Sequence, residues 1–328
     1  MARDPIACLG AGRMGRGIAV AFAYAGHKVT LVDVKSRAAA AFDDLEHAAM
    51  AEVRETLRVL AQLGLFAEGA VDAIVARVSI VPEADAATAL SSSAVVFEGV
   101  PEVVELKRAV LARAARLAGP DPIIASTTST ILVDDLSGAV EHPARFLNAH
   151  WLNPAYLVPL IELSPGAKTD AAVTARLRAL LEGIGKVPVV CAPRPGYIVP
   201  RIQALAMNEA ARMVEEGVAS AEEIDKAIKY GFGFRYAVMG LLEFVDWGGG
   251  DILYYASRYL TQALGSDRYA APAIVERNMK EGRIGFSSRR GFLDYSNLDL
   301  EAHRRARLKE FVTMLGQLGL ARPPVVEE

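Results

Sequence analysis

Short apolar runs and longer amphipathic segments alternate along the first part of the chain. The short runs have the length of buried strands, while the longer segments carry apolar residues at the spacing of a helix face. The expected strands are residues 5–9, 28–32, 95–97 and 122–125, and the expected helices are residues 16–25, 38–63 (one helix or two) and 104–117. Strands that alternate with helices are typical of an α/β fold, so the pattern predicts a doubly wound, mostly parallel sheet.

The hydrophobic pattern changes after a last short apolar run at residues 187–191. Residues 192–196 are rich in proline and resemble a linker, and beyond them the apolar residues follow helical spacing. The clearest helical segments are residues 199–216, 221–230 and 252–264. A length of 328 residues exceeds the usual span of a single hydrophobic core. We therefore expect two domains, an α/β domain over residues 1–193 and an all-helical domain over residues 194–328.

One stretch of the first domain, residues 146–166, combines two apolar ends with a polar corner. The ends suit two strands of a buried sheet, and Asn153-Pro154 breaks the run between them. If these strands pair, His150 and Glu162 converge, so that Glu162 accepts a hydrogen bond from one ring nitrogen and the other nitrogen can take a proton. The alternative is a hydrogen-bonded pair in the core without a catalytic role.

The first expected strand runs directly into a glycine loop that is followed by a helix. Gly10 permits a tight turn, Gly12 lets a pyrophosphate approach the backbone, and Gly15 lets the helix pack closely on the strand. We expect these glycines and Met14 to bind a dinucleotide at the helix N-terminus, where free N–H groups favour an anion. Asp33 ends the second strand, where its carboxylate can bind the ribose 2′-hydroxyl and would repel a 2′-phosphate. The motif predicts a Rossmann-type domain that binds NAD in preference to NADP; the alternative is a structural glycine turn.

A run of hydroxyl side chains follows the expected strand at residues 122–125. Ligands bind at the carboxyl ends of strands in open parallel sheets, and residues 126–130, Ser-Thr-Thr-Ser-Thr, lie at such an end. These hydroxyl groups can equally cap the next helix. Ser129 is a candidate site residue because it lies 21 positions before His150.

Composition narrows the classes of partner. The formal net charge of −3 gives no basic footprint for nucleic acid or an anionic membrane, and charged residues or proline interrupt every apolar run before it reaches membrane-spanning length. With only Cys8 and Cys191, we expect no disulfide framework and a reducing, cytoplasmic location. We expect a small-molecule substrate, no metal ion, and a homodimer formed through the aromatic-rich helices of the second domain.

Together, these motifs resemble the 3-hydroxyacyl-CoA dehydrogenase family over most of the chain. The family combines a Rossmann domain and a helical dimerisation domain with a His-x-x-Asn-Pro motif and a Glu twelve positions after the His; this chain has His150, Asn153 and Glu162 at those places. The family's cofactor-contacting Glu and Lys fall on Glu102 and Lys107. The resemblance implies an NAD-dependent dehydrogenase that acts on a 3-hydroxy group.

The resemblance also implies a role for each residue of the site. His150 takes the hydroxyl proton as hydride leaves the carbon, and Glu162 fixes the ring's tautomer and stabilises the imidazolium. Ser129 falls on the family serine that hydrogen-bonds the substrate oxygen, beside the cofactor, and Asn153 holds the same oxygen. These roles stay predictions at this point.

Two departures from the family pattern bear on the substrate. Acyl-CoA enzymes carry an Asn beside the substrate where this chain has Pro200, and they place a Lys in the segment that reads Tyr-Leu-Val-Pro-Leu here, at residues 156–160. These changes, with residues 233–240, look more like the lambda-crystallin and gulonate 3-dehydrogenase branch, and carnitine dehydrogenases and a pyridoxine-breakdown dehydrogenase are similar. The resemblance to that branch implies a small free hydroxy acid as substrate.

Arg235 is the candidate for recognising the carboxylate of such an acid. The surrounding glycines predict a turn between helices, and a guanidinium binds a carboxylate with two parallel hydrogen bonds. The alternative is a solvated or stacking arginine. Three other functions stay open: a short-chain 3-hydroxyacyl-CoA (3-hydroxybutyryl-CoA) dehydrogenase, a dehydrogenase of a small aromatic carboxylate, and a non-catalytic NAD-binding protein of the crystallin kind.

Overall fold

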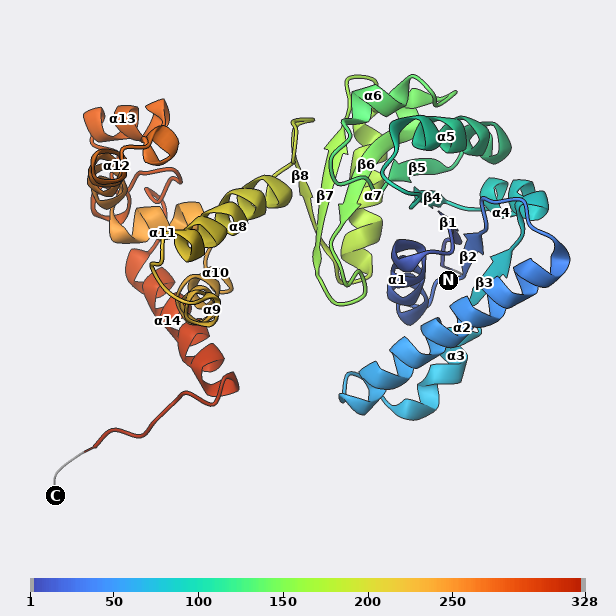
Figure 1. Cartoon of the computed structure of the whole chain (residues 1–328), viewed down its shortest axis with the longest axis horizontal. Coiled ribbons are helices and arrows are strands. Elements are labelled where there is room, and N and C mark those ends of the chain that lie inside the picture. The colour runs from blue at the N-terminus through green and yellow to red at the C-terminus, as the bar shows by residue number, and fades with distance from the viewer. Residues whose placement is uncertain (1–2, 326–328) are drawn as a thin grey trace. The chain divides into compact units, whose positions relative to one another are not determined.

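The computed structural model describes residues 3–325, and its N-terminal part is built on an eight-stranded sheet (Figure 1). The strands are β1 (Ile6–Leu9), β2 (Val29–Val32), β3 (Val78–Val81), β4 (Val95–Glu98), β5 (Ile123–Ser126), β6 (Phe146–Trp151), β7 (Leu160–Pro165) and β8 (Val187–Val190). They follow the order β3-β2-β1-β4-β5-β6-β7-β8 across the sheet. All neighbours pair in parallel except β6 and β7, so the predicted doubly wound, mostly parallel α/β fold is confirmed.

Helices cover both faces of this sheet, and each face has its own hydrophobic core. The helices are α1 (Arg13–Tyr24), α2 (Ala39–Gln62), α3 (Val71–Val75), α4 (Ala86–Ser91), α5 (Val104–Ala118), α6 (Val133–Ser137) and α7 (Ala171–Gly183). Residues of α1, α2, α3 and α7 pack against one face, and residues of α4, α5 and α6 pack against the other. The strands are therefore buried on both sides, which explains why they read as unbroken apolar runs.

Two details of the sheet domain go beyond the sequence pattern. The strand β3 was not predicted, because its Val-Ser-Ile-Val run is short and alternates between buried and more exposed positions; it pairs with β2 at the sheet edge. The segment for which one or two helices were expected forms the single 24-residue helix α2. Its buried residues are Ala49, Val53, Leu57, Leu60 and Ala61, which recur at the helical period and face the core.

The C-terminal part of the chain is helical, as predicted. Its helices are α8 (Val199–Glu215), α9 (Ala221–Ala227), α10 (Phe234–Tyr236), α11 (Leu241–Gly248), α12 (Gly250–Leu264), α13 (Ala273–Lys280) and α14 (Leu300–Gln317). The prediction of a turn around Arg235 is wrong, because α9 continues through a π-helical segment, Ile228–Gly233, directly into α10. Gly233 has φ and ψ of −63° and −41°, so it adopts the helical conformation and does not end the helix.

The chain divides into two compact units, and the boundary between them falls between Met207 and Asn208, within α8. The first turn of α8 belongs to the sheet-containing unit, where the amide of Val199 and that of Ile198, directly before the helix, donate hydrogen bonds to Glu162 of β7. The domain boundary expected between residues 193 and 194 stays a prediction. Within residues 3–325, no helix is both long and apolar enough to cross a membrane.

Candidate active site

His150 and Glu162 face each other across the antiparallel pair of β6 and β7. The register places the two residues directly opposite, and the Nδ1 atom of His150 lies 2.8 Å from the Oε2 atom of Glu162. Both residues are buried, with exposed fractions of 7% and 0%. A carboxylate at Nδ1 fixes the proton of the neutral imidazole on that nitrogen, which leaves Nε2 able to accept a proton.

The second carboxylate oxygen of Glu162 accepts two backbone hydrogen bonds at the start of α8. The amides of Ile198 and Val199 each lie 2.8 Å from its Oε1 atom, where a helix N-terminus favours negative charge. Burial raises the pKa of Glu162, but the hydrogen bonds from His150, Val199 and Ile198 outweigh it and hold the pKa below its usual value. Glu162 is therefore ionised at neutral pH and can stabilise an imidazolium. Pro200 fits here because the first turn of a helix needs no N–H donor at that position.

Tyr197 completes the surroundings of His150 and was not among the predicted site residues. The two rings stack with their centroids 5.5 Å apart and an interplanar angle of 18°. The Tyr197 hydroxyl accepts a hydrogen bond from Nδ2 of Asn148 at 2.8 Å and donates one to the carbonyl oxygen of Thr128 at 3.1 Å. Its φ of 44° lies in the left-handed region, which residues other than glycine adopt infrequently. The only local signal for this role is its place directly after a Pro-Gly step, because its partners are far away in the sequence.

Ser129 lies in the loop after β5, and Glu102 holds that loop. The Oε1 atom of Glu102 accepts hydrogen bonds from the amides of Ser129 and Thr130, at 3.0 and 3.1 Å, and from the hydroxyl groups of Thr128 and Thr130. Burial raises the pKa of Glu102, but these hydrogen bonds and the charge of Lys107 prevail and lower it. The predicted contacts of Ser129 with a substrate oxygen and of Glu102 with the cofactor stay predictions.

Lys107 is buried beside Glu98, the last residue of β4. Its Nζ atom lies 2.9 and 3.1 Å from the two carboxylate oxygens of Glu98, and the Glu102 carboxylate is 3.4 Å away. With an exposed fraction of 1%, Lys107 organises the loop after β4 from inside. A direct contact of Lys107 with the cofactor stays a prediction. Sequence reasoning missed the role of Glu98, although its place between a buried strand and a glycine was visible.

Asn153 is exposed in the turn after β6, and a buried lysine fixes that turn. The Nζ atom of Lys186 donates hydrogen bonds to the carbonyl oxygens of Ala155 at 2.7 Å and Val158 at 2.8 Å. Burial lowers the pKa of Lys186, and its ammonium also lies 5.6 Å from the centre of the Trp151 ring. Lys186 was also missed, because it lies directly before β8 and nothing local marks its partners.

The glycine loop between β1 and α1 has the geometry that a dinucleotide needs. Gly10 has a φ of 100°, and a Cβ atom on Gly15 would lie 2.0 Å from the carbonyl oxygen of Gly10, so both positions require glycine. A Cβ atom on Gly12 would meet nothing within 4 Å, which leaves this backbone open to a pyrophosphate. The helix α1 starts at Arg13, and Met14 is half-buried next to it. The residues present therefore fit NAD.

Asp33 follows β2 and is buried, with 4% of its surface exposed. The Nε atom of Arg37 lies 2.6 Å from its Oδ2 atom, and the amide of Lys35 lies 3.2 Å from its Oδ1 atom. A carboxylate offers about four acceptor positions, so this pairing leaves capacity for ribose hydroxyl groups. The ribose contact stays a prediction, and Arg37 is a partner that sequence reasoning did not consider.

Arg235 belongs to the helical unit, where its guanidinium lies over the ring of Phe244, 4.9 Å from the centroid. This is the stacking arrangement that the sequence left open as the alternative to a clamp. Recognition of a substrate carboxylate by Arg235 stays a prediction.

Two sequence models of one protein family match successive parts of the chain. Residues 5–194 match the NAD binding domain of 3-hydroxyacyl-CoA dehydrogenase, and residues 196–295 match its C-terminal domain. The chain belongs to the 3-hydroxyacyl-CoA dehydrogenase family. It is an NAD-dependent dehydrogenase that acts on a hydroxyl group, which confirms the cofactor and the enzyme class predicted from the sequence.

Individual relatives are similar over most of the chain. The 5-formyl-3-hydroxy-2-methylpyridine 4-carboxylate 5-dehydrogenase of Mesorhizobium japonicum is 32% identical over 94% of this chain and 96% of its own length. The lambda-crystallin homolog of Bos taurus is 33% identical over 77% of each chain. Among solved structures, the 3-hydroxyacyl-CoA dehydrogenase of Archaeoglobus fulgidus has a TM-score of 0.76 and 30% identity, covering 97% of this chain and 100% of that one. The family members therefore include an acyl-CoA enzyme and a pyridine carboxylate enzyme.

Proposed function

We propose that this dehydrogenase oxidises the 3-hydroxy group of a small free hydroxy acid, with His150 as the base. The observation that carries the proposal is the hydrogen-bonded chain behind His150, in which Nδ1 meets Glu162 at 2.8 Å and the other Glu162 oxygen accepts hydrogen bonds from the amides of Ile198 and Val199 at the start of α8. This arrangement keeps Glu162 ionised and directs Nε2 to proton transfer. Tyr197, stacked on His150, ties it to the loop that carries Ser129.

Each residue of the proposed site has one task in the reaction. NAD, when bound on the glycine loop, supplies the hydride acceptor. His150 removes the hydroxyl proton through Nε2, and Glu162 stabilises the resulting imidazolium. Ser129 and Asn153 donate hydrogen bonds to the oxygen as it becomes a carbonyl. Positioned proton transfer of this kind contributes about 10²–10⁴ to the rate.

A free acid is favoured by the departures from the acyl-CoA pattern. Pro200 has no side-chain amide to hydrogen-bond a thioester substrate, and it lies in the first turn of α8, next to the amides that hold Glu162. The relative from Mesorhizobium japonicum is similar over 94% of this chain and is named for a pyridine carboxylate, which supports a substrate with a free carboxylate. Arg235, whose guanidinium stacks on Phe244, stays a candidate from the sequence for recognising the carboxylate.

Two other substrates have specific support. The similarity to the acyl-CoA enzyme of Archaeoglobus fulgidus, with its TM-score of 0.76, favours a short 3-hydroxyacyl-CoA such as 3-hydroxybutyryl-CoA. The identity of 32% to the Mesorhizobium enzyme favours a small aromatic carboxylate.

A substrate comparison read by NADH absorbance tests the proposal. The panel contains 3-hydroxybutyrate, gulonate and a hydroxymethylated pyridine carboxylate for oxidation, and acetoacetyl-CoA for reduction. We expect the highest kcat/KM for a free acid. A kcat/KM for acetoacetyl-CoA more than about tenfold above every free acid, a difference of about 1.4 kcal/mol, would overturn the assignment.

We also propose that the protein is a cytoplasmic homodimer that associates through its helical unit. On α12, Ile252, Tyr255 and Tyr259 are exposed at 62%, 63% and 70%, and their spacing of three and four residues places them on one face of the helix. Apolar surface of this kind marks an interaction site more often than a free surface. A mass of twice the chain by light scattering would support the dimer, and a monomer at micromolar concentration would contradict it.

A further inference from the structure

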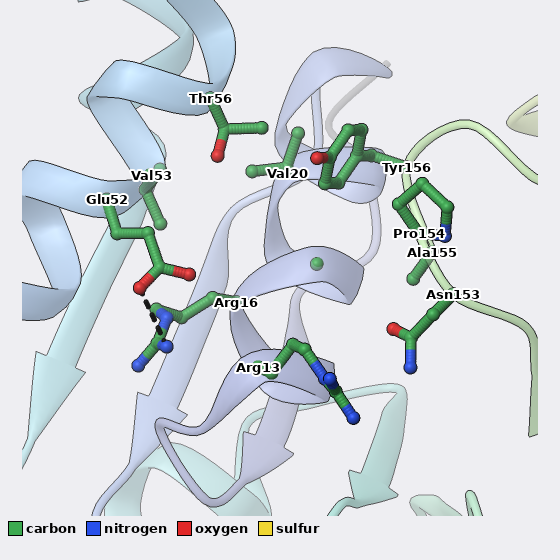
Figure 2. A pocket seen from close by; sticks show the side chains of 11 residues that line it. Arg13, Arg16, Val20, Glu52, Val53, Thr56, Asn153, Pro154, Ala155 and Tyr156 are labelled. Atoms are coloured by element: carbon green, nitrogen blue, oxygen red, sulfur yellow. Dashed lines mark ion pairs between the residues drawn. The ribbon is translucent and has the colours of Figure 1, made fainter.

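A pocket of about 310 Å³ lies beside the turn that carries Asn153 (Figure 2). Its walls come from α1, α2 and that turn, all within the sheet-containing unit. Its charged and polar lining residues are Arg13, Arg16, Glu52, Thr56, Asn153 and Tyr156. Because Asn153 is a candidate contact for the reacting oxygen, the pocket adjoins the proposed site of chemistry.

The two arginines of this pocket differ in their interaction partners. Arg16 pairs with Glu52 at 2.8 Å and donates a hydrogen bond to the carbonyl oxygen of Ala11 at 2.6 Å. Arg13 is exposed and has no ion pair with any residue that lines the pocket, and Figure 2 shows its side chain extending toward the side that holds Asn153. The pocket walls therefore carry one guanidinium without a counter-charge.

We propose that Arg13, and not Arg235, binds the carboxylate of the substrate in this pocket, an inference that rests on the proposed function. A guanidinium meets a carboxylate with two parallel hydrogen bonds, and an ammonium does not reproduce this geometry. Asn153 both lines the pocket and follows His150 by three positions in the same β6 segment and turn. An acid anchored at Arg13 in this pocket thus has its remaining atoms beside Asn153, the one residue of the pocket lining that is proposed to hold the reacting oxygen.

The size and charge of the pocket specify the class of ligand. Pockets that bind drug-sized ligands span roughly 300–1,000 Å³, so a volume of about 310 Å³ suits a small acid. With Glu52 on the opposite wall, the pocket has only one uncompensated positive charge, which matches one carboxylate better than several phosphates. The competing anion is the pyrophosphate of NAD, because Arg13 directly follows Gly12.

A binding titration with two matched probes tests the proposal. Acetoacetate is titrated calorimetrically into the NAD-saturated protein, where both partners are oxidised and no hydride is transferred. Methyl acetoacetate, which lacks the charge, is titrated in the same way. For Arg13→Gln we expect the dissociation constant of acetoacetate to rise at least about fivefold. The affinities for methyl acetoacetate and for NAD should not change, and Arg13→Lys should recover only part of the loss.

Controls separate this proposal from its alternatives. Arg58→Gln removes an exposed arginine of α2 that pairs with Glu55 outside the pocket, and it should leave every affinity unchanged. If Arg13→Gln weakens NAD binding, Arg13 contacts the pyrophosphate and the proposal is wrong. It is equally wrong if the variant binds acetoacetate as the parent does, or if the parent does not bind it. Because the titration needs no turnover, a protein that reduces only acetoacetyl-CoA would refute the proposed function but not the anion pocket.

Discussion

The hydroxyl group of Tyr197 allows a one-atom test of how the site is held together. In Tyr197→Phe the ring that stacks on His150 remains, and only the oxygen that bonds Asn148 at 2.8 Å and the carbonyl of Thr128 at 3.1 Å is lost. The Nδ2 atom of Asn148 keeps a second partner, the carbonyl oxygen of Ile131 at 2.9 Å. The carbonyl of Thr128 loses the Tyr197 donor, so the largest effect falls on the loop that carries the hydroxyl residues.

The size of the effect follows from these contacts. A buried hydrogen bond contributes about 0.5–1.5 kcal/mol net, and a buried group left unpaired costs about 1–3 kcal/mol. We therefore expect Tyr197→Phe to lower the free energy of unfolding by about 1–2 kcal/mol. Because Thr128 precedes Ser129, the freed loop displaces the Ser129 hydroxyl, and a misplacement of about 1 Å can reduce the rate up to about a hundredfold. For a smaller shift we expect kcat to fall about tenfold.

Urea unfolding and steady-state kinetics measure the two effects separately. The affinity for NAD should not change, and neither should the pH at which kcat/KM is half-maximal, since the ring against His150 is intact. Asn148→Ala removes the partner of the same hydroxyl, so the double variant should be less than additive with Tyr197→Phe. A variant that is destabilised but keeps the parent's kcat would show that the hydroxyl is purely structural and would refute the reasoning.

Three further predictions concern the charged residues. In Glu162→Gln, kcat should fall while NAD still binds. Because the pKa of Glu162 is held below its usual value, the parent loses stability as the pH falls through that lowered pKa. The melting temperature should therefore fall less in the variant than in the parent between about pH 7 and pH 3. Asp33 should make NAD strongly preferred, and Asp33→Asn should narrow the ratio of kcat/KM for NAD over NADP; comparable efficiencies in the parent would contradict this. Because Arg13 is proposed to bind the carboxylate, Arg235→Lys should leave KM for the acid substrate within about twofold and spare NAD binding; a several-fold rise in KM would assign the carboxylate to Arg235 and contradict the proposal for Arg13.

Local sequence pattern was sufficient for most elements of the fold. The strands around the glycine loop were predictable because parallel strands are buried on both faces and read as apolar runs. The short edge strand β3 was missed, since half of its positions are not buried. The prediction of a turn at Arg235 was wrong for a different reason. Gly233 adopts helical angles, and a glycine indicates a turn only where the residues around it do not form a helix.

The candidate site shows the same division between local and distant information. The pairing of His150 with Glu162 could be anticipated because both residues lie in adjacent strands joined by a short turn. The contacts of Tyr197 and Lys186 could not, because their partners lie on other elements and no spacing rule connects them. Residues that position a site from outside its own segment become visible only when the chain is folded.

The central claim is that His150 is the acid–base group of this dehydrogenase, and His150→Gln tests it most directly. The measurement is kcat with the best free acid from the substrate panel, together with the dissociation constant of NADH. We predict that kcat falls at least about a hundredfold while NADH binding stays within about twofold, because only proton transfer loses its partner. A variant that turns over within a few-fold of the parent would contradict the account and place the chemistry elsewhere.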